Sequence, residues 1–216
     1  SFELGDEAVR IAEGVVTHDY SDTEYAVSRS GAIVVRPGSD RNRGLTRVTL
    51  SGEPTPLMET NLEVANPRFS PDGRRVVYSR ARDLVGSGVD LWILDRESGL
   101  ETRLTTESDF NISPVWNRDG TQVRYTSSQS DFAIRDIFTR PADLSAPPTR
   151  LGTEGGFLGK PSSSGEPIPY SVWANDGQAD IWVMDGDGTN GREFIATQFL
   201  EAFPSISPNG EWIAYS

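Results

Sequence analysis

An aspartate recurs three times at the start of a short apolar run, and this repeated carboxylate is the first feature that could do chemistry. The copies are Asp90, Asp136 and Asp180, each followed by an aliphatic and an aromatic residue. Carboxylates that line a channel or a loop rim can coordinate a cation. Short carboxylates at strand starts also tend to hydrogen-bond backbone amides. We name the three as ligand-binding candidates and favour the backbone role for them.

A second acidic run, Asp185-Gly186-Asp187-Gly188-Thr189-Asn190-Gly191, has the composition of a calcium loop. A loop of the EF-hand type needs Gly at its sixth position and Glu at its twelfth, where this chain has Asn190 and Ala196. Such residues also make hairpin turns, and Arg96-Glu97-Ser98-Gly99 occupies the same place in an earlier repeat. We therefore predict a turn here, no cofactor and no metal, with bound Ca²⁺ as the alternative.

Catalytic constellations are hard to assemble from these residues. His18 is the only histidine, cysteine is absent, and no Gly-x-Ser-x-Gly elbow occurs. One histidine without cysteine cannot build the usual zinc sites. The 32 acidic residues guarantee many carboxylate pairs, so they single out no glycosidase pair. We predict that this chain is not an enzyme, with a glycosidase or a peptidase-associated domain as the alternative.

The tryptophans recur in register with the apolar runs, which favours packing between structural units over a stacking platform for sugars. Trp173 lies outside the repeated motifs, and we therefore name it as the candidate for an exposed ligand contact. The five tryptophans are Trp92, Trp116, Trp173, Trp182 and Trp212.

The charge and hydropathy of the chain limit its partners. The formal net charge is −12, and so acidic a surface repels the phosphate backbone of nucleic acids. No stretch approaches the roughly 18 consecutive apolar residues of a membrane span. The chain begins at Ser1 without Met or a signal pattern, which suggests a piece of something longer. We expect a protein or a small ligand as the partner, with neither nucleic acid nor membrane insertion.

The elements that must position these residues repeat along the chain. Five times, a polar turn ending in Gly precedes a β-branched and aromatic run. Pro pre-sets φ and Gly accepts positive φ, so each such turn closes a β-hairpin. The steps between the turn glycines are 42, 47, 45 and 45 residues, a period typical of β-propeller blades. The turn glycines are Gly31, Gly73, Gly120, Gly165 and Gly210.

Each repeat has room for four short strands, and one such sheet cannot bury both of its faces alone. Packing the sheets around an axis buries them and leaves only short edges. We predict an all-β fold, a single β-propeller domain over residues 1–216 with four-stranded antiparallel blades and about five blade equivalents. The expected blades are residues 20–64, 65–110, 111–157, 158–200, and 201–216 together with 1–19.

The fifth blade would thus be shared by both termini. Phe2-Glu3-Leu4 and Ala8-Val9-Arg10-Ile11-Ala12 supply its last two strands, and Arg10-Ile11 matches Arg103-Leu104 of the second blade. A closed ring predicts a monomer, and an open one predicts a strand-swapped dimer. A truncated ring of six or seven blades is the alternative.

The motif Ser70-Pro71-Asp72-Gly73, with Asp90-Leu91-Trp92-Ile93-Leu94-Asp95 after it, resembles the TolB-like repeat, also called the WD40-like or PD40 repeat. The resemblance covers nearly the whole chain, and within that family it is strongest to the C-terminal propellers of bacterial transmembrane serine/threonine protein kinases. There are departures: Ser163-Ser164-Gly165 replaces Pro-Asp-Gly, and the last blade lacks its outer half.

The resemblance implies a periplasmic or extracytoplasmic sensor or scaffold domain. We predict a non-catalytic domain that binds a protein or a ligand at its loop-rich face or central funnel, where converging loops form concave sites. A purely structural spacer is a further alternative.

Overall fold

The computed structural model describes residues 25–28, 33–35, 43–49, 51–85, 87–106, 110–128, 135–152, 155–174 and 177–216. Within these ranges the regular secondary structure is β throughout, which confirms the predicted all-β fold. The same ranges contain no helix with the length and apolarity to cross a membrane.

The strands form small antiparallel sheets in which consecutive strands are neighbours. The first blade consists of β1 (Tyr25–Val27), β2 (Ile33–Val35), β3 (Arg43–Val48) and β4 (Pro54–Thr60). The second consists of β5 (Val64–Phe69), β6 (Arg75–Ala81), β7 (Val89–Asp95) and β8 (Glu101–Arg103). The third consists of β9 (Phe110–Trp116), β10 (Gln122–Ser128), β11 (Asp136–Pro141) and β12 (Thr149–Leu151).

The fourth blade consists of β13 (Phe157–Leu158), β14 (Ile168–Trp173), β15 (Ala179–Met184) and β16 (Arg192–Ile195). A last hairpin pairs β17 (Ser205–Ile206) with β18 (Ile213–Ala214). Single parallel bridges join successive sheets, Val89 to Phe110 and Lys160 to Ser205.

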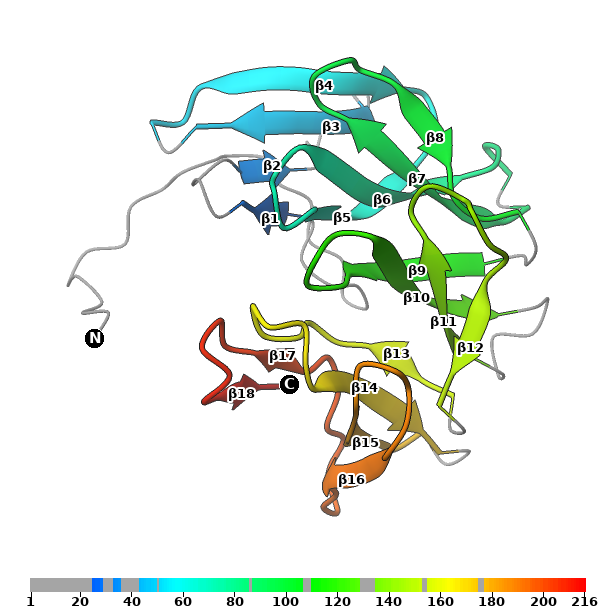
Figure 1. Cartoon of the computed structure of the whole chain (residues 1–216), viewed down its shortest axis with the longest axis vertical. Coiled ribbons are helices and arrows are strands. Elements are labelled where there is room, and N and C mark those ends of the chain that lie inside the picture. The colour runs from blue at the N-terminus through cyan, green and yellow to red at the C-terminus, as the bar shows by residue number, and fades with distance from the viewer. Residues whose placement is uncertain are drawn as a thin grey trace.

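The sheets fan around a common centre (Figure 1). Strands β1, β5, β9, β13 and β17 lie innermost, and β4, β8, β12 and β16 lie at the periphery. Contacts between β1 and β5, β5 and β9, and β9 and β13 hold the inner strands side by side. This arrangement is the predicted β-propeller.

Apolar side chains point to both faces of the strands, which explains why the sheets must stack. Successive side chains of a strand point to opposite faces. On β6, Val76 and Tyr78 pack in a cluster with Leu45 of the first blade, whereas Val77 packs in another with Trp116 of the third. Each middle blade is therefore covered on both faces by its neighbours.

Arginines of one blade also reach the turns of the next. Arg75 donates from Nη2 to the carbonyl oxygen of Gly120 at 2.7 Å, and its guanidinium lies over the Trp116 ring. Arg124 donates to the carbonyls of Gly165 and Gly186 at 3.0 and 2.9 Å. We call these contacts the arginine staples. They add directional hydrogen bonds to the apolar packing between blades.

The innermost strands carry an irregularity that the sequence analysis did not use. The residues before Pro67, Pro114 and Pro204 adopt φ values of 51, 51 and 53°, in the left-handed region. Beside the first two, the pairing of β5 with β6 and of β9 with β10 shifts register. Each proline lies six residues before a turn glycine. The bulge is therefore a feature of the repeat, and it bends the inner strand.

Residues 1–24 lie outside the described residues, with His18 and the segment proposed to complete the fifth blade, so the sharing of that blade stays a prediction. The expectation that the tryptophans in register with the strands pack between blades is wrong for Trp212, which is 74% exposed. It lies at the last hairpin, and no other described segment covers its side chain.

Candidate ligand-binding funnel

Strand direction alternates within each blade, so the two ends of the propeller are built from different connections between strands. The innermost strand of a blade ends in the turn that carries the repeated glycine, and the turn between the third and fourth strands lies at the same end. We call this end the turn face. The connections from second to third strand and from blade to blade lie at the opposite end, the loop face.

A cavity of about 410 Å³ opens on the turn face, within the size range of ligand pockets. We call it the funnel. Successive blades contribute the same part of the repeat to it, namely the end of the innermost strand and the turn that follows. Its wall consists of residues 27–28, 68–71, 115–118, 160–163, Gly165, Ile206 and Pro208.

The side chains of the polar residues that begin the turns form hydrogen bonds within those turns. The side chain of Ser70 accepts a hydrogen bond from the Arg75 backbone N–H at 2.9 Å and donates to Asp72 at 2.6 Å. The side-chain oxygen of Asn117, at the same position in the next blade, accepts the Gln122 N–H at 2.9 Å. These residues shape the funnel but offer a ligand little spare hydrogen-bonding capacity.

The charged residues that the structure describes in the funnel wall are all cationic. Arg68, Arg118 and Lys160 line it, and no described Asp or Glu does. The whole chain has 32 acidic and 20 basic residues, so this lining is opposite in sign to the molecule as a whole. An apolar belt that includes Phe69, Trp116 and Ile206 accompanies the cations.

Two described acidic residues, Asp72 and Asp119, directly follow residues of the funnel wall and are engaged in their own turns. Asp72 accepts hydrogen bonds from Ser70 Oγ and from the Arg74 N–H at 3.0 Å, and these bonds hold its pKa below the usual value. Asp119 accepts from the hydroxyl and the N–H of Thr121, which lowers its pKa in the same way. Local donors thus satisfy both carboxylates.

A smaller cavity of about 300 Å³ adjoins the funnel between the third and fourth blades. Arg118, Arg124 and Glu166 are among its lining residues. Arg124 is only 7% exposed, and this burial lowers the pKa of its guanidinium. Because Arg124 is committed to the two carbonyls of its staple, we interpret this cavity as part of the junction between blades.

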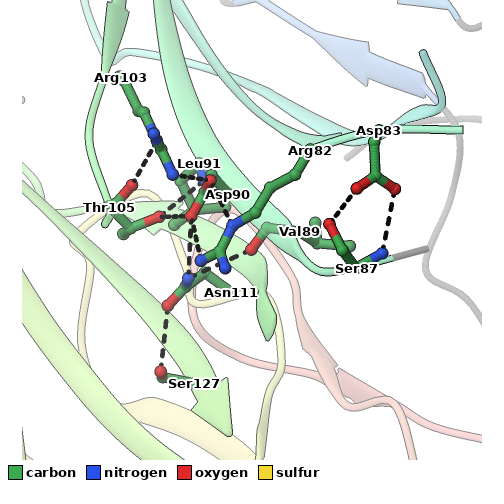
Figure 2. Close-up of polar contacts among 10 residues, drawn as sticks. All are labelled: Arg82, Asp83, Ser87, Val89, Asp90, Leu91, Arg103, Thr105, Asn111 and Ser127. Atoms are coloured by element: carbon green, nitrogen blue, oxygen red, sulfur yellow. Dashed lines mark hydrogen bonds and ion pairs between the residues drawn. The ribbon is translucent and has the colours of Figure 1, made fainter. Parts of the chain in front are cut away.

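The structure places the predicted site residue Asp90 in a buried ion-pair network on the loop-face side (Figure 2). Its carboxylate, 1% exposed, accepts from Arg82 Nε and Nη2 at 2.9 and 3.0 Å and also from Arg103. The network continues through Asn111 to Ser127, whose hydroxyl donates to Asn111 at 3.0 Å. These contacts join the second and third blades and favour a structural role for Asp90.

The other two aspartates are less enclosed. Asp136 accepts from Arg150 at 2.7 Å, in a pair whose side chains are 29 and 46% exposed. In the fourth blade the position of Arg103 and Arg150 is taken by Phe194, and Asp180 is only partly buried. The carboxylate–arginine pair is therefore present in two of the three blades that have the aspartate.

Trp173 lies at the loop-face end of β14 and is half-buried. Its ring meets Phe157 edge-on, with centroids 6.3 Å apart and planes at 78°. The indole Nε1 is buried and has no hydrogen-bond partner among the described residues. Its ligand contact stays a prediction.

The acidic run from Asp185 forms the turn between β15 and β16. Asp187 accepts hydrogen bonds from Thr189 within the turn, and Asn190 donates to Asp185 at 2.6 Å. Across the described part of the chain, no three His, Cys, Asp or Glu residues cluster closely enough to hold a metal ion.

The four predicted site residues and the funnel lie at opposite ends of the propeller. Most of the missed residues had a usable signal, because they occupy the positions four and five residues before a turn glycine. Arg118, two residues before Gly120, lies outside these positions. Aligning the repeats on those glycines places Arg68-Phe69, Val115-Trp116 and Lys160-Pro161 in the same two columns.

Comparisons with known proteins agree with this geometry. The profile of the family described as "TolB beta propeller domain" matches residues 49–216. An uncharacterized protein of Agrobacterium fabrum is 29% identical over 169 residues, which are 74% of this chain and 56% of that protein. The uncharacterized peptidase YuxL of Bacillus subtilis is 25% identical over 170 residues, 78% of this chain and 24% of that protein.

Among solved structures, a putative TolB from Agrobacterium tumefaciens superposes with a TM-score of 0.70 at 23% identity. The match covers 90% of this chain and 74% of that chain. The chain thus resembles a solved propeller in fold, and it spans about half or less of the length of these two curated relatives.

Proposed function

Because the chain belongs to the TolB β-propeller domain family, we propose that it is a non-catalytic binding domain whose partner docks in the funnel of the turn face. The observation that carries this proposal is the funnel itself. Equivalent segments of successive blades line it with apolar and cationic side chains in a cavity of about 410 Å³. A concave, largely apolar site with a few polar groups is the usual form of a binding site.

The domain acts as a sensor or scaffold within a larger bacterial protein, in a periplasmic or extracytoplasmic compartment. The greater length of its curated relatives supports a larger parent protein. The family resemblance supports the compartment. The attachment to a transmembrane kinase rests on the repeat motifs alone, and the sequence that flanks this domain in its parent is the direct test.

A second candidate function is that of a propeller that accompanies a peptidase domain. The similarity to YuxL favours it, since the matched residues make up 24% of that protein. Here too the propeller would bind rather than cleave. A peptidase domain beside this segment in the parent protein would favour this candidate, and a kinase domain would favour the first.

Peptide-library selection followed by hydrogen exchange tests the proposed binding site. A random peptide library is panned on the purified chain, and amide exchange is compared with and without each selected peptide. We expect slower exchange in residues 68–71, 115–118 and 160–163, with residues 192–195 on the outer strand of the fourth blade unchanged. Protection confined to the outer strands or to the loop face would overturn the proposal.

A further inference from the structure

The last hairpin, formed by β17 and β18, has two strands, whereas each of the four blades before it has four. We infer that the outer edge of β18 binds the same edge of a second copy of this chain, so that two hairpins form one four-stranded sheet. This inference does not depend on the funnel. It concerns a second interaction surface at the end of the described fan of blades.

The backbone of β18 offers hydrogen-bonding groups along its outer edge. The carbonyl of Trp212 and both backbone groups of Ser216 hydrogen-bond to the inner side of the hairpin, at 2.8 to 3.0 Å. Because bonding alternates along an antiparallel strand, Ile213 and Tyr215 direct their N–H and C=O groups away from β17. No other described strand pairs with this edge (Figure 1).

The edge of β18 lacks the residues that discourage strand pairing at the outermost strands of the blades. Charged side chains and prolines at an edge oppose the addition of another strand. From Trp212 to Ser216 the chain has neither. The outermost strands all have them, namely Pro54, Pro56 and Glu59 in β4, Glu101 and Arg103 in β8, Arg150 in β12, and Arg192 and Glu193 in β16. The sequence therefore protects these four edges and leaves β18 able to pair.

Tyr215 belongs to a column of tyrosines that are otherwise buried. Its counterparts Tyr78, Tyr125 and Tyr170, also five residues after a turn glycine, are at most 2% exposed. Each of them lies opposite an aromatic residue of the third strand of its blade, as Tyr125 lies opposite Phe138. Tyr215 is 51% exposed. Its side chain thus has the type and position of one that a further strand covers.

The edge is complementary to itself when two copies pair antiparallel about Ala214. The two Ala214 residues then face each other in a non-hydrogen-bonded pair, where strands approach most closely and a small side chain fits. Ile213 of each copy lies opposite Tyr215 of the other, which gives an aliphatic–aromatic contact on one face. Trp212, 74% exposed, lies opposite Ser216 on the other face. The pairing uses the same edge of both copies, so it closes as a dimer and does not propagate.

The predicted terminal strands of the fifth blade compete for the same edge. Aligned on the aromatic residue, the first of them places Ser1 and Glu3 where the second blade has Leu91 and Ile93. Both of those residues are buried in the apolar core between blades. Burying a hydroxyl and a carboxylate in their places is costly. A second copy of β18 brings no charged residue to the edge, which favours it as the occupant.

Light scattering at increasing protein concentration tests the inference. Because an interface between strand edges is small, we expect the mass to rise from that of one chain, 23.7 kDa, towards twice that value between about 1 and about 200 μM. Ala214→Lys brings two like charges face to face and should keep the chain monomeric over this range.

Ala146→Lys is the matched control for the charge. It makes the same substitution at an exposed position between β11 and β12, so it should dimerise like the wild type. Circular dichroism and the thermal midpoint establish that both variants fold.

Disulfide trapping locates the contact. The chain has no cysteine, so a single introduced thiol has no competitor. Ala214→Cys places two thiols across the dimer axis with Cα atoms about 4.5 Å apart, within the range of a disulfide. We expect it to form a covalent dimer on mild oxidation at least about tenfold faster than Ala146→Cys, because the dimer holds its thiols at a high effective concentration.

Several outcomes would overturn the inference. They are the mass of one chain at every concentration, equal effects of Ala214→Lys and Ala146→Lys on the mass, and equal trapping of the two cysteine variants. An intramolecular disulfide in the double variant Glu3→Cys/Ala214→Cys would overturn it as well, since residues 1–4 would then occupy the edge. Because β18 contributes no residue to the described funnel wall, these outcomes leave the proposed function untouched.

Discussion

Asp90 and Asp136 occupy the same position in successive blades, yet their surroundings differ. Two arginines enclose the Asp90 carboxylate, which is almost fully buried, whereas Asp136 pairs with one partly exposed arginine. Neutralising a buried carboxylate leaves its cationic partners without a counter-charge, while an exposed pair contributes little. The same substitution should therefore have unequal effects at the two positions.

We predict that Asp90→Asn lowers the free energy of unfolding by about 3 kcal/mol and that Asp136→Asn lowers it by less than about 1 kcal/mol. Denaturant unfolding of both variants at neutral pH measures the difference. Equal losses would mean that the Asp90 network does not carry the stability that its burial implies. The Asp136 variant serves as the control for changing the repeated motif as such.

Asp72 gives the fold a dependence on acid. Its pKa is lowered by the bonds from Ser70 and the Arg74 N–H, so the folded state favours the charged form. The resulting stability is complete above about pH 5 and is lost as the pH falls through the lowered folded-state pKa. We predict that Asp72→Asn lowers the thermal midpoint slightly at pH 7 and that the difference from the wild type shrinks towards zero below about pH 3.

Thermal melts at a series of pH values check this prediction. The fifth repeat has Asn209 where the second has Asp72, so asparagine is compatible with the turn. A difference that stays constant over the whole pH range would show that the charge of Asp72 plays no part.

At the scale of the element, the bulge of the inner strand beside Pro114 restricts which residue can precede the proline. Ser113 has φ of 51°, which β-branched side chains tolerate poorly and asparagine tolerates well. We predict that Ser113→Val lowers the free energy of unfolding by about 1–2 kcal/mol, whereas Ser113→Asn is nearly neutral. Asn66 occupies the equivalent position of the second blade, with the same φ of 51°. Thermal unfolding of the two variants measures the difference, and an equal loss of stability in both would contradict the role of the positive φ.

The elements were the most predictable part of the molecule. Each strand pair is specified by a local turn and by alternation, and both can be read within a few residues of one another. The left-handed residues before Pro67 and Pro114 were missed because a bulge breaks the alternation on which the strand prediction depended. The exposure of Trp212 was missed for another reason: burial depends on which segment covers a strand, and local sequence does not specify that.

At the scale of the whole molecule, the arginine staples couple neighbouring blades. Arg124→Lys keeps the charge but cannot span both carbonyls with a planar fork, so at least one of the two hydrogen bonds is lost. We predict a loss of about 2 kcal/mol in the free energy of unfolding and faster amide exchange in the fourth blade than in the second. Arg192→Lys is the surface control, and its effect should stay within about 0.5 kcal/mol. Uniformly faster exchange across all blades would argue against a local staple.

The candidate site was the least predictable part, because it exists only after the blades have been brought together. Arg68 and Lys160 are 92 residues apart in the sequence and line the same cavity. The repeat predicts that such positions converge, but a functional residue is more easily noticed by an unusual type than by its place in a repeated column. The predicted site residues Asp90, Asp136, Asp180 and Trp173 all lie towards the loop face instead.

Some residues of each turn hold the turn in place and others line the funnel, and this separation affects how such a domain can diversify. The residue three positions before the turn glycine is committed to the turn, as Ser70 and Asn117 are. The two residues before it differ from blade to blade, and one of them, Trp116, also packs in the apolar core between blades. Arg68 and Lys160, five residues before their turn glycines, line the funnel, and substitutions in this column can change what the molecule recognises while the hairpins stay intact. New specificities are thus accessible by single substitutions, without passing through unfolded intermediates in evolution.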